Sequence, residues 1–204
     1  MPYVEGYGTW PFGEEWLWEA MATCYLPLLD VLDDAPELTL SLTPVLCDQL
    51  AAPGIGERFL AFLRDVRTET HRRDAAAADD PAVVRELERS AGDYARAADR
   101  FEALGGDLLG ALAPHAAWTS SATHAVLPLL ATDAGVRLQV RTGVESHRER
   151  FARPWRGGFW SPECGHGEWL NPLLEAEGVH ATCVDLTDVF GRGDEWHLRP
   201  IRSA

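Results

Sequence analysis

Apolar positions in the first hundred residues repeat with the period of helices. Between Gly13 and about Asp33 they recur every three or four positions, which predicts a helix with one buried face, kinked at Pro27. The same period returns after Gly54 and again after Asp80, which is placed to cap a helix that continues to about residue 104. We expect the two helices within about 54–104 to form an antiparallel hairpin.

Strand-like patterns begin at residues 38–43, where leucines alternate with threonine and serine. The second half of the chain then alternates short strand candidates with helical segments. The expected strands are 116–121, 157–160 and 180–185, and the expected helices begin near His124, at Asp133 and at about residue 167. Alternating strands and helices predict parallel pairing and an α/β fold. No internal repeat or linker divides the chain, so a single domain is expected.

Composition removes several classes of function. The 204 residues are 46% hydrophobic, enough for a substantial core, and the net charge of −14 opposes binding to nucleic acid or to an anionic membrane. All 18 basic residues are arginine, which excludes Schiff-base chemistry and the lysine of a phosphate-binding loop. No run of about 18 apolar residues and no signal segment is present, so we expect a cytoplasmic protein without a membrane span.

Glu163 is the first candidate for chemistry, in the segment GFWSPECGHGEW. It could be an acid near a helix N-terminus, where the helix dipole stabilises a carboxylate by about 0.3 to 1 kcal/mol. Alternatively, Pro162 holds a working carboxylate in place and Trp160 supplies a dry wall that strengthens its electrostatic interactions. Spacing alone leaves both interpretations open.

Two further segments suggest binding. Five aromatic residues crowd the opening segment, Tyr3, Tyr7, Trp10, Phe12 and Trp16, and their rings could stack on sugars or pack beneath the loop. His124 follows an expected strand, where it could bind a substrate hydroxyl, cap a helix or belong to the core.

A metal or cofactor site is not expected. His166, Glu168 and Cys164 lie beside Glu163, but they lack the spacing of zinc ligands, and the four cysteines form no C-x-x-C pair. GIGERF at 54–59 lacks the third glycine of a dinucleotide fingerprint.

Three segments together carry a resemblance to a known family. They are MPYVEGYGTWPFGEEWLWEA at the start, SATHAVLPLLAT in the middle and GGFWSPECGHGEWLNPLLE later. In this order and at these separations they resemble glycoside hydrolase family 57, most closely its 1,4-α-glucan branching enzymes.

The resemblance implies a (β/α)7 barrel, a retaining mechanism and α-1,4-glucans such as amylose or glycogen as substrates, with transfer that forms α-1,6 branches. Glu163 matches the nucleophile of the family's W-x-P-E-C motif, and His124 matches the substrate-binding histidine of T-H-x-x-L-P. Trp10 matches an aromatic of the donor subsites, and Trp160 and Trp16 are expected to bind substrate with it.

Departures from the family pattern qualify this expectation. The family's His-x-His strand precedes the segment that matches Met1, no residue here matches the general acid, and Ser161 replaces a bulky apolar residue. We therefore expect 1–204 to form an incomplete barrel with the hairpin inserted, and to have little branching activity alone, because protonation of the leaving group contributes about 10²- to 10⁴-fold.

Other functions remain open at this point. An α-amylase or a 4-α-glucanotransferase would share the core motifs. A non-catalytic glucan-binding protein, or one subunit of a split enzyme, would keep the binding residues. A metal-dependent polysaccharide deacetylase would need a ligand cluster that the sequence lacks. The oligomeric state is also left open.

Overall fold

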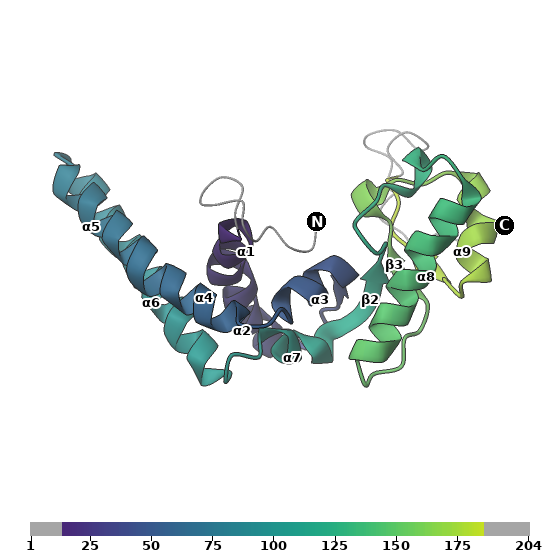
Figure 1. Ribbon diagram of the computed structural model, residues 1–204, viewed down its shortest axis with the longest axis horizontal. Coiled ribbons are helices and arrows are strands. Elements are labelled where there is room, and N and C mark those ends of the chain that lie inside the picture. The colour runs from purple at the N-terminus through teal and green to yellow at the C-terminus, as the bar shows by residue number, and fades with distance from the viewer. Residues whose placement is uncertain (1–13, 186–204) are drawn as a thin grey trace. The chain divides into compact units, whose positions relative to one another are not determined.

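The computed structural model describes residues 14–185, and these divide into two compact units. Unit 1 contains the described residues 14–40 and 45–116 and is helical, whereas unit 2 contains 41–44 and 117–185 and holds most of the sheet (Figure 1). The sequence indicated no such division.

Unit 1 is built from consecutive helices. A nearly continuous rod runs through α1 (Glu15–Ala20), the π-helical turn η1 (Met21–Tyr25) and α2 (Leu26–Asp34), and it covers the first predicted helix. The π turn ends two residues before Pro27, whose missing N–H cannot continue the regular ladder of helical hydrogen bonds. The remaining elements are α3 (Pro44–Leu50), α4 (Ile55–Ala61), η2 (Phe62–Arg67), α5 (Thr68–Ala77), α6 (Pro81–Ala103), α7 (Leu108–Leu112) and η3 (Ala113–His115).

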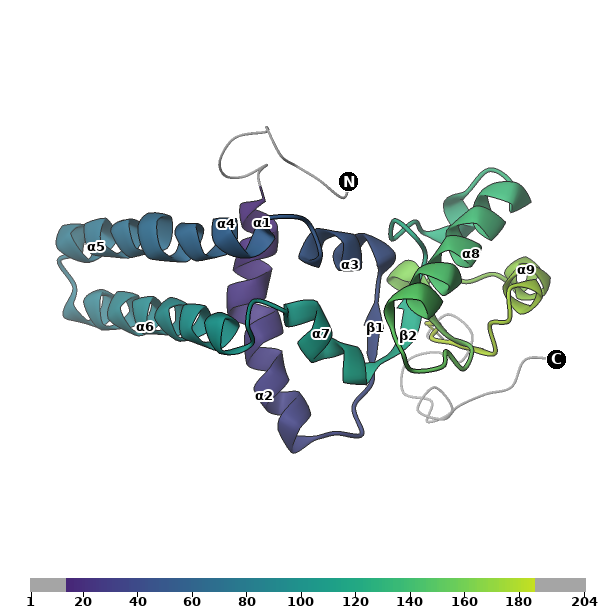
Figure 2. The same ribbon diagram turned by 60° about the horizontal axis from the view of Figure 1, so that its bottom comes forward.

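An antiparallel hairpin dominates unit 1. Figure 2 shows the continuous helix α4–η2–α5 beside α6, with the α1–α2 rod crossing both. Asp80 caps α6 as predicted, because its side chain accepts a hydrogen bond of 2.7 Å from the backbone N–H of Ala82. Phe59 and Phe101 meet edge to face in the core, with ring centroids 5.0 Å apart.

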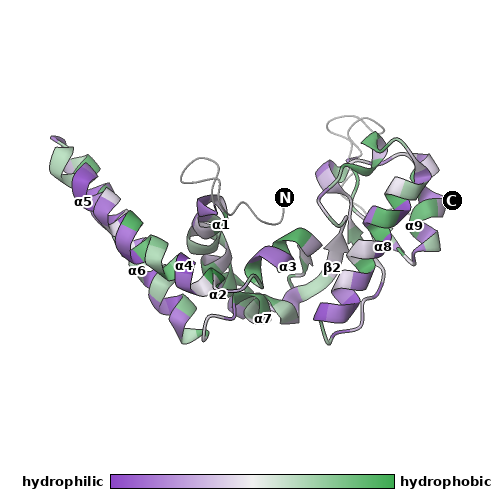
Figure 3. Cartoon of the chain, in the orientation of Figure 1, coloured by the Kyte–Doolittle hydropathy of each residue, from purple (hydrophilic) through white to green (hydrophobic). Residues whose placement is uncertain are grey.

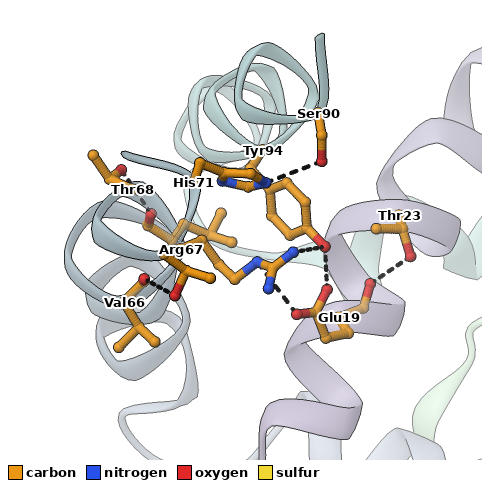
Figure 4. A network of polar contacts seen from close by, with 10 residues as sticks. Glu19, Thr23, Val66, Arg67, Thr68, His71, Ser90 and Tyr94 are labelled. Carbon is orange, nitrogen blue, oxygen red and sulfur yellow. Dashed lines mark hydrogen bonds and ion pairs between the residues drawn. The ribbon is translucent and has the colours of Figure 1, made fainter. Parts of the chain in front are cut away.

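A polar network ties the hairpin to the first helix (Figure 4). The hydroxyl of Tyr94 donates to the carboxylate of Glu19 and accepts a hydrogen bond of 2.9 Å from Arg67. The Arg67 guanidinium also lies 4.4 Å from the Tyr94 ring centroid, over the face of the ring. Burial, followed by the neighbouring Glu19, raises the pKa of Tyr94 to about 12. The network therefore joins α1, η2 and α6 through one buried tyrosine.

Unit 2 contains the strands that position the candidate site. The sheet has the order β1-β2-β3-β4, and β2 pairs in parallel with β3 and β3 with β4, as predicted. Its elements are β1 (Leu40–Leu42), β2 (Ala116–Ser120), η4 (Leu127–Leu129), α8 (Asp133–Arg150), β3 (Gly158–Trp160), η5 (Pro162–Cys164), η6 (Glu168–Leu170), α9 (Asn171–Ala176) and β4 (Ala181–Thr182).

Helix α8 packs tightly against this sheet. Val136 and Val140 are fully buried with Phe159 of β3, and Figure 3 shows hydrophobic and hydrophilic residues sharing the surface of α8 as expected for a helix with one buried face. At Gly143 the helix touches β2 so closely that a Cβ atom would lie 2.1 Å from the Ser120 carbonyl oxygen. The close approach requires glycine at this position.

Candidate active site

The candidate residues of unit 2 follow the carboxyl ends of neighbouring strands. Thr119 and Ser120 of β2 are in register with Phe159 and Trp160 of β3, and Phe159 is in register with Thr182 of β4. Because these strands are parallel, the segments that follow them leave the sheet at one edge. In α/β folds this edge is where ligands bind.

Buried hydroxyl groups join the three strand ends. Ser120 donates a hydrogen bond of 2.8 Å to the carbonyl oxygen of Trp160, and the hydroxyls of Ser161 and Thr182 lie 2.9 Å apart. Ser161 is fully buried. Ser161, which departs from the expected family pattern, thus forms a polar link to β4. Residue spacing alone carries no signal for this link.

Glu163 lies in a tight turn directly after β3. Its backbone is left-handed, with φ 57° and ψ 22°, and Cys164 follows with φ 52°. Hydrogen bonds from Cys164 N to Ser161 O (2.9 Å) and from Gly165 N to Pro162 O (3.0 Å) close the turn. Left-handed backbone costs a side-chain-bearing residue about 1 to 2 kcal/mol, and such strain is concentrated at functional sites. The turn leaves the Glu163 side chain exposed at the sheet edge.

His124 occupies a second strained loop, after β2. Its φ is also 57°, its N–H donates to Ser121 O at 3.2 Å, and its side chain is exposed. The helix predicted to begin near His124 is wrong: η4 is a single turn, and the next α-helix begins at Asp133, capped by Thr132. The left-handed residue prevents a helix from starting there, and Pro128 cannot donate the N–H that would extend one.

The two strained loops touch each other. A Cβ atom at Gly165 would lie 3.1 Å from Val126 Cγ1 and 3.4 Å from Pro128 Cδ, so the loop after Glu163 rests against the loop after His124. The structure therefore brings Glu163 and His124 onto adjoining loops. Trp160 ends β3 two residues before Pro162, and 37% of its side chain is exposed.

The thiol of Cys164, next to Glu163 in the turn, is held in its protonated form. Burial raises the pKa of the Cys164 thiol, and the negative charges of Cys183, Asp185 and Glu163 raise it further. Cys164 is therefore a protonated thiol at neutral pH. The same interactions place Asp185, beyond β4, within electrostatic range of the turn, although the sequence assigned it no role.

Two more residues were predicted to bind substrate, Trp16 and Trp10. Trp16 lies on α1 in unit 1, where 60% of its side chain is exposed. Trp10 lies outside the described residues, so its role stays a prediction.

Residues 14–185 hold no group of three or more histidine, cysteine, aspartate or glutamate side chains arranged to bind a metal ion. None of their helices combines the length and apolarity needed to cross a bilayer.

The chain is similar to known proteins in sequence and in fold. Residues 117–203 match the family model described as glycosyl hydrolase family 57. The chain is 31% identical to the 1,4-α-glucan branching enzyme of Thermococcus kodakarensis over 84% of its own length and 27% of the relative's. It is 30% identical to a probable 1,4-α-glucan branching enzyme of Mycobacterium tuberculosis, over 94% of this chain and 41% of that one.

Solved structures agree with the fold class. The branching enzyme of Pyrococcus horikoshii superposes with a TM-score of 0.73 at 30% identity, over 89% of this chain and 39% of that one. An α-amylase of Thermotoga maritima has a TM-score of 0.72 at 24% identity, which shows the shared fold alone. The predicted resemblance and the α/β fold with parallel strands are confirmed, and the chain spans 27% to 41% of the length of these relatives.

Proposed function

We propose that this chain, which resembles glycosyl hydrolase family 57 over residues 117–203, acts on α-1,4-glucans by a retaining mechanism with Glu163 as the nucleophile. One observation carries the proposal. An exposed carboxylate is held in a left-handed turn at the carboxyl edge of the sheet, against the loop that presents His124. A fold that keeps glutamate where glycine would cost less favours a chemical role for that side chain.

The turn suits attack on a sugar. A carboxylate oxygen of Glu163 would attack the anomeric carbon as the bond to the leaving oxygen breaks, forming a covalent glycosyl ester. The leaving oxygen keeps the electron pair of that bond and needs a proton from a general acid, the role that no residue here matches. Closure of the turn by two backbone hydrogen bonds fixes the backbone that carries the carboxylate, so the main chain needs little reorganisation during the reaction. The exposed face of Trp160 can stack on a glucose ring, and His124 can bind a sugar hydroxyl.

The acceptor decides the overall reaction. If the 6-hydroxyl of another glucan displaces the Glu163 carboxylate from the anomeric carbon, an α-1,6 branch forms. If water displaces it, the glucan is hydrolysed. The similarity to named branching enzymes supports branching over hydrolysis or 4-α-glucan transfer. Glycogen-like glucans as the natural substrate, and a cytoplasmic location, stay predictions.

An α-maltosyl fluoride assay tests Glu163 directly. Fluoride departs with the electron pair of its bond to carbon and needs no proton donor, so glycosyl-enzyme formation depends on the nucleophile alone. Mass spectrometry of the proteolysed chain should find the sugar on the peptide that contains Glu163. Glu163→Gln should abolish the label and fluoride release, whereas Glu168→Gln, an exposed glutamate five residues later, should retain both.

The outcomes separate the competing functions. A label on Glu163 with few new α-1,6 linkages, counted by proton NMR of a treated amylose, supports a nucleophile that lacks its general acid. Many new α-1,6 linkages would support branching and overturn the expectation of little activity alone. Retardation of the chain in an amylose-containing gel without any label favours the non-catalytic glucan-binding alternative. Equal labelling of wild type and Glu163→Gln contradicts the proposal.

A further inference from the structure

Gln139 connects helix α8 to the loop that carries His124. Its side-chain oxygen accepts hydrogen bonds from both Thr123 donors, the backbone N at 3.0 Å and Oγ1 at 3.3 Å. Its backbone oxygen accepts a third from Ala122 N at 3.0 Å. One residue of α8 thus holds the two residues that immediately precede His124.

The helix that provides these acceptors is itself immobilised. Val136 and Val140, on either side of Gln139 along α8, are fully buried. One turn further on, the Gly143 carbonyl oxygen accepts a hydrogen bond of 2.9 Å from Thr119 Oγ1 of β2. Gln139 therefore lies on a part of the helix that is packed against the sheet, and its hydrogen bonds can restrain the loop.

His124 needs such support because its backbone is strained. A histidine at φ 57° is disfavoured relative to a right-handed or extended conformation, and the loop would relax if nothing restrained it. The remaining restraints are local: His124 N donates to Ser121 O, and Ser121 Oγ donates to Ala125 O at 3.1 Å. Of the hydrogen bonds described for residues 121–125, those to Gln139 are the ones that reach another element, helix α8.

We propose that Gln139 is a positioning residue that holds His124 in its α-glucan-binding orientation. The proposal rests on the proposed function for its ligand, an α-1,4-glucan, but not for its geometry. An amide oxygen has two lone pairs, which match the two Thr123 donors. Gln139→Glu keeps an oxygen acceptor at that place, whereas Gln139→Leu keeps the size of the side chain and removes the acceptor.

The first measurement needs no ligand. In two-dimensional NMR of the free chain, the Thr123 amide should exchange with solvent about tenfold faster in Gln139→Leu than in wild type or Gln139→Glu, because a lost hydrogen bond of ordinary strength corresponds to that factor. The His124 imidazole signals should shift in Gln139→Leu alone. Unchanged exchange and unchanged imidazole signals overturn the positioning role, whatever the chain binds.

The second measurement is the affinity for amylose, from retardation in gels that contain increasing amylose. Gln139→Leu should weaken binding about three- to tenfold, Gln139→Glu should restore it to within about twofold, and Leu138→Ala, an exposed neighbour on α8, should have no effect. In the background of His124→Ala, Gln139→Leu should cause no further loss, because its effect passes through the histidine.

One result would contradict the positioning role of Gln139, and another would contradict the proposed function. Additive losses from Gln139→Leu and His124→Ala would mean that Gln139 acts on the fold in general and would overturn the positioning role. If wild type binds no amylose, the proposed function fails and the glucan named here fails with it, while the NMR comparison still decides whether Gln139 orders the loop.

Discussion

Replacing Glu163 with glycine should stabilise the protein while removing its proposed chemistry. The residue has a left-handed backbone, a conformation that glycine adopts without steric cost and other residues adopt only under strain. Its side chain is exposed, so little packing is lost with it. Most substitutions destabilise a protein, and a gain at this position would identify strain kept for function.

The size of the gain follows from two opposing effects. Relief of the left-handed strain contributes about 1 to 2 kcal/mol. The extra flexibility of glycine in the unfolded chain reduces this gain by about 0.5 to 1 kcal/mol. The net increase in the free energy of unfolding should be about 0.5 to 1 kcal/mol. Glu163→Ala keeps a Cβ atom and therefore keeps the strain, so it should give no gain.

Urea unfolding at 25 °C, monitored by tryptophan fluorescence, measures the difference in the free energy of unfolding between the variants. Each variant is compared by the midpoint and the slope of its unfolding curve. Glu88→Gly is the matched control, because Glu88 is exposed within the regular helix α6, where the same substitution should cost about 1 kcal/mol. Glu163→Gly should also lose labelling by α-maltosyl fluoride.

The reasoning would be refuted if Glu163→Gly were no more stable than Glu163→Ala. The left-handed turn would then hold no recoverable strain, and the argument that this position is kept for chemistry would lose its physical basis. A stable Glu163→Gly that still forms the glycosyl enzyme would contradict the nucleophile itself.

Two further predictions concern packing and pH. Gly143→Ala should lower the free energy of unfolding by about 1 to 3 kcal/mol or more, because its Cβ would collide with backbone that cannot move aside. Gly92→Ala on α6, where the Cβ would meet only the end of an arginine side chain, should raise it by up to about 1 kcal/mol, and urea unfolding measures both variants. Tyr94→Phe should cost about 1 to 2 kcal/mol at pH 8 through its lost hydroxyl bonds. Folding raises the pKa of Tyr94 to about 12 from an unfolded value near 10, so its contribution to stability should be complete below pH 10 and disappear as the pH rises toward 12. Between pH 8 and pH 11 the free energy of unfolding should therefore fall less in Tyr94→Phe than in wild type.

The elements that the sequence predicted well are those defined by local periodicity. Helix α8 begins at Asp133 as expected, Asp80 caps α6, and the parallel strands follow from the alternation of strands and helices. In these cases the residues that determine the element are neighbours along the chain, so their pattern is visible without the fold.

The chemistry of the candidate site was predictable only in part. Motif resemblance selected Glu163 and His124, but the expected helix at His124 was wrong because periodicity does not reveal a left-handed histidine. The role of Gln139 had no sequence signal, since its partner Thr123 lies 16 positions earlier and the contact forms only when α8 packs on the sheet.

By itself the sequence determined most of the helices, the strands and their parallel pairing, and the motifs that carry the resemblance, because each depends on patterns of residues close together in the chain. Tertiary structure decided how the two strained loops meet, how Ser161 beside Glu163 is linked to β4, and which helix restrains the His124 loop. Those features are contacts between distant segments, and their geometry is set by how strands pair and how α8 packs, which no local pattern encodes.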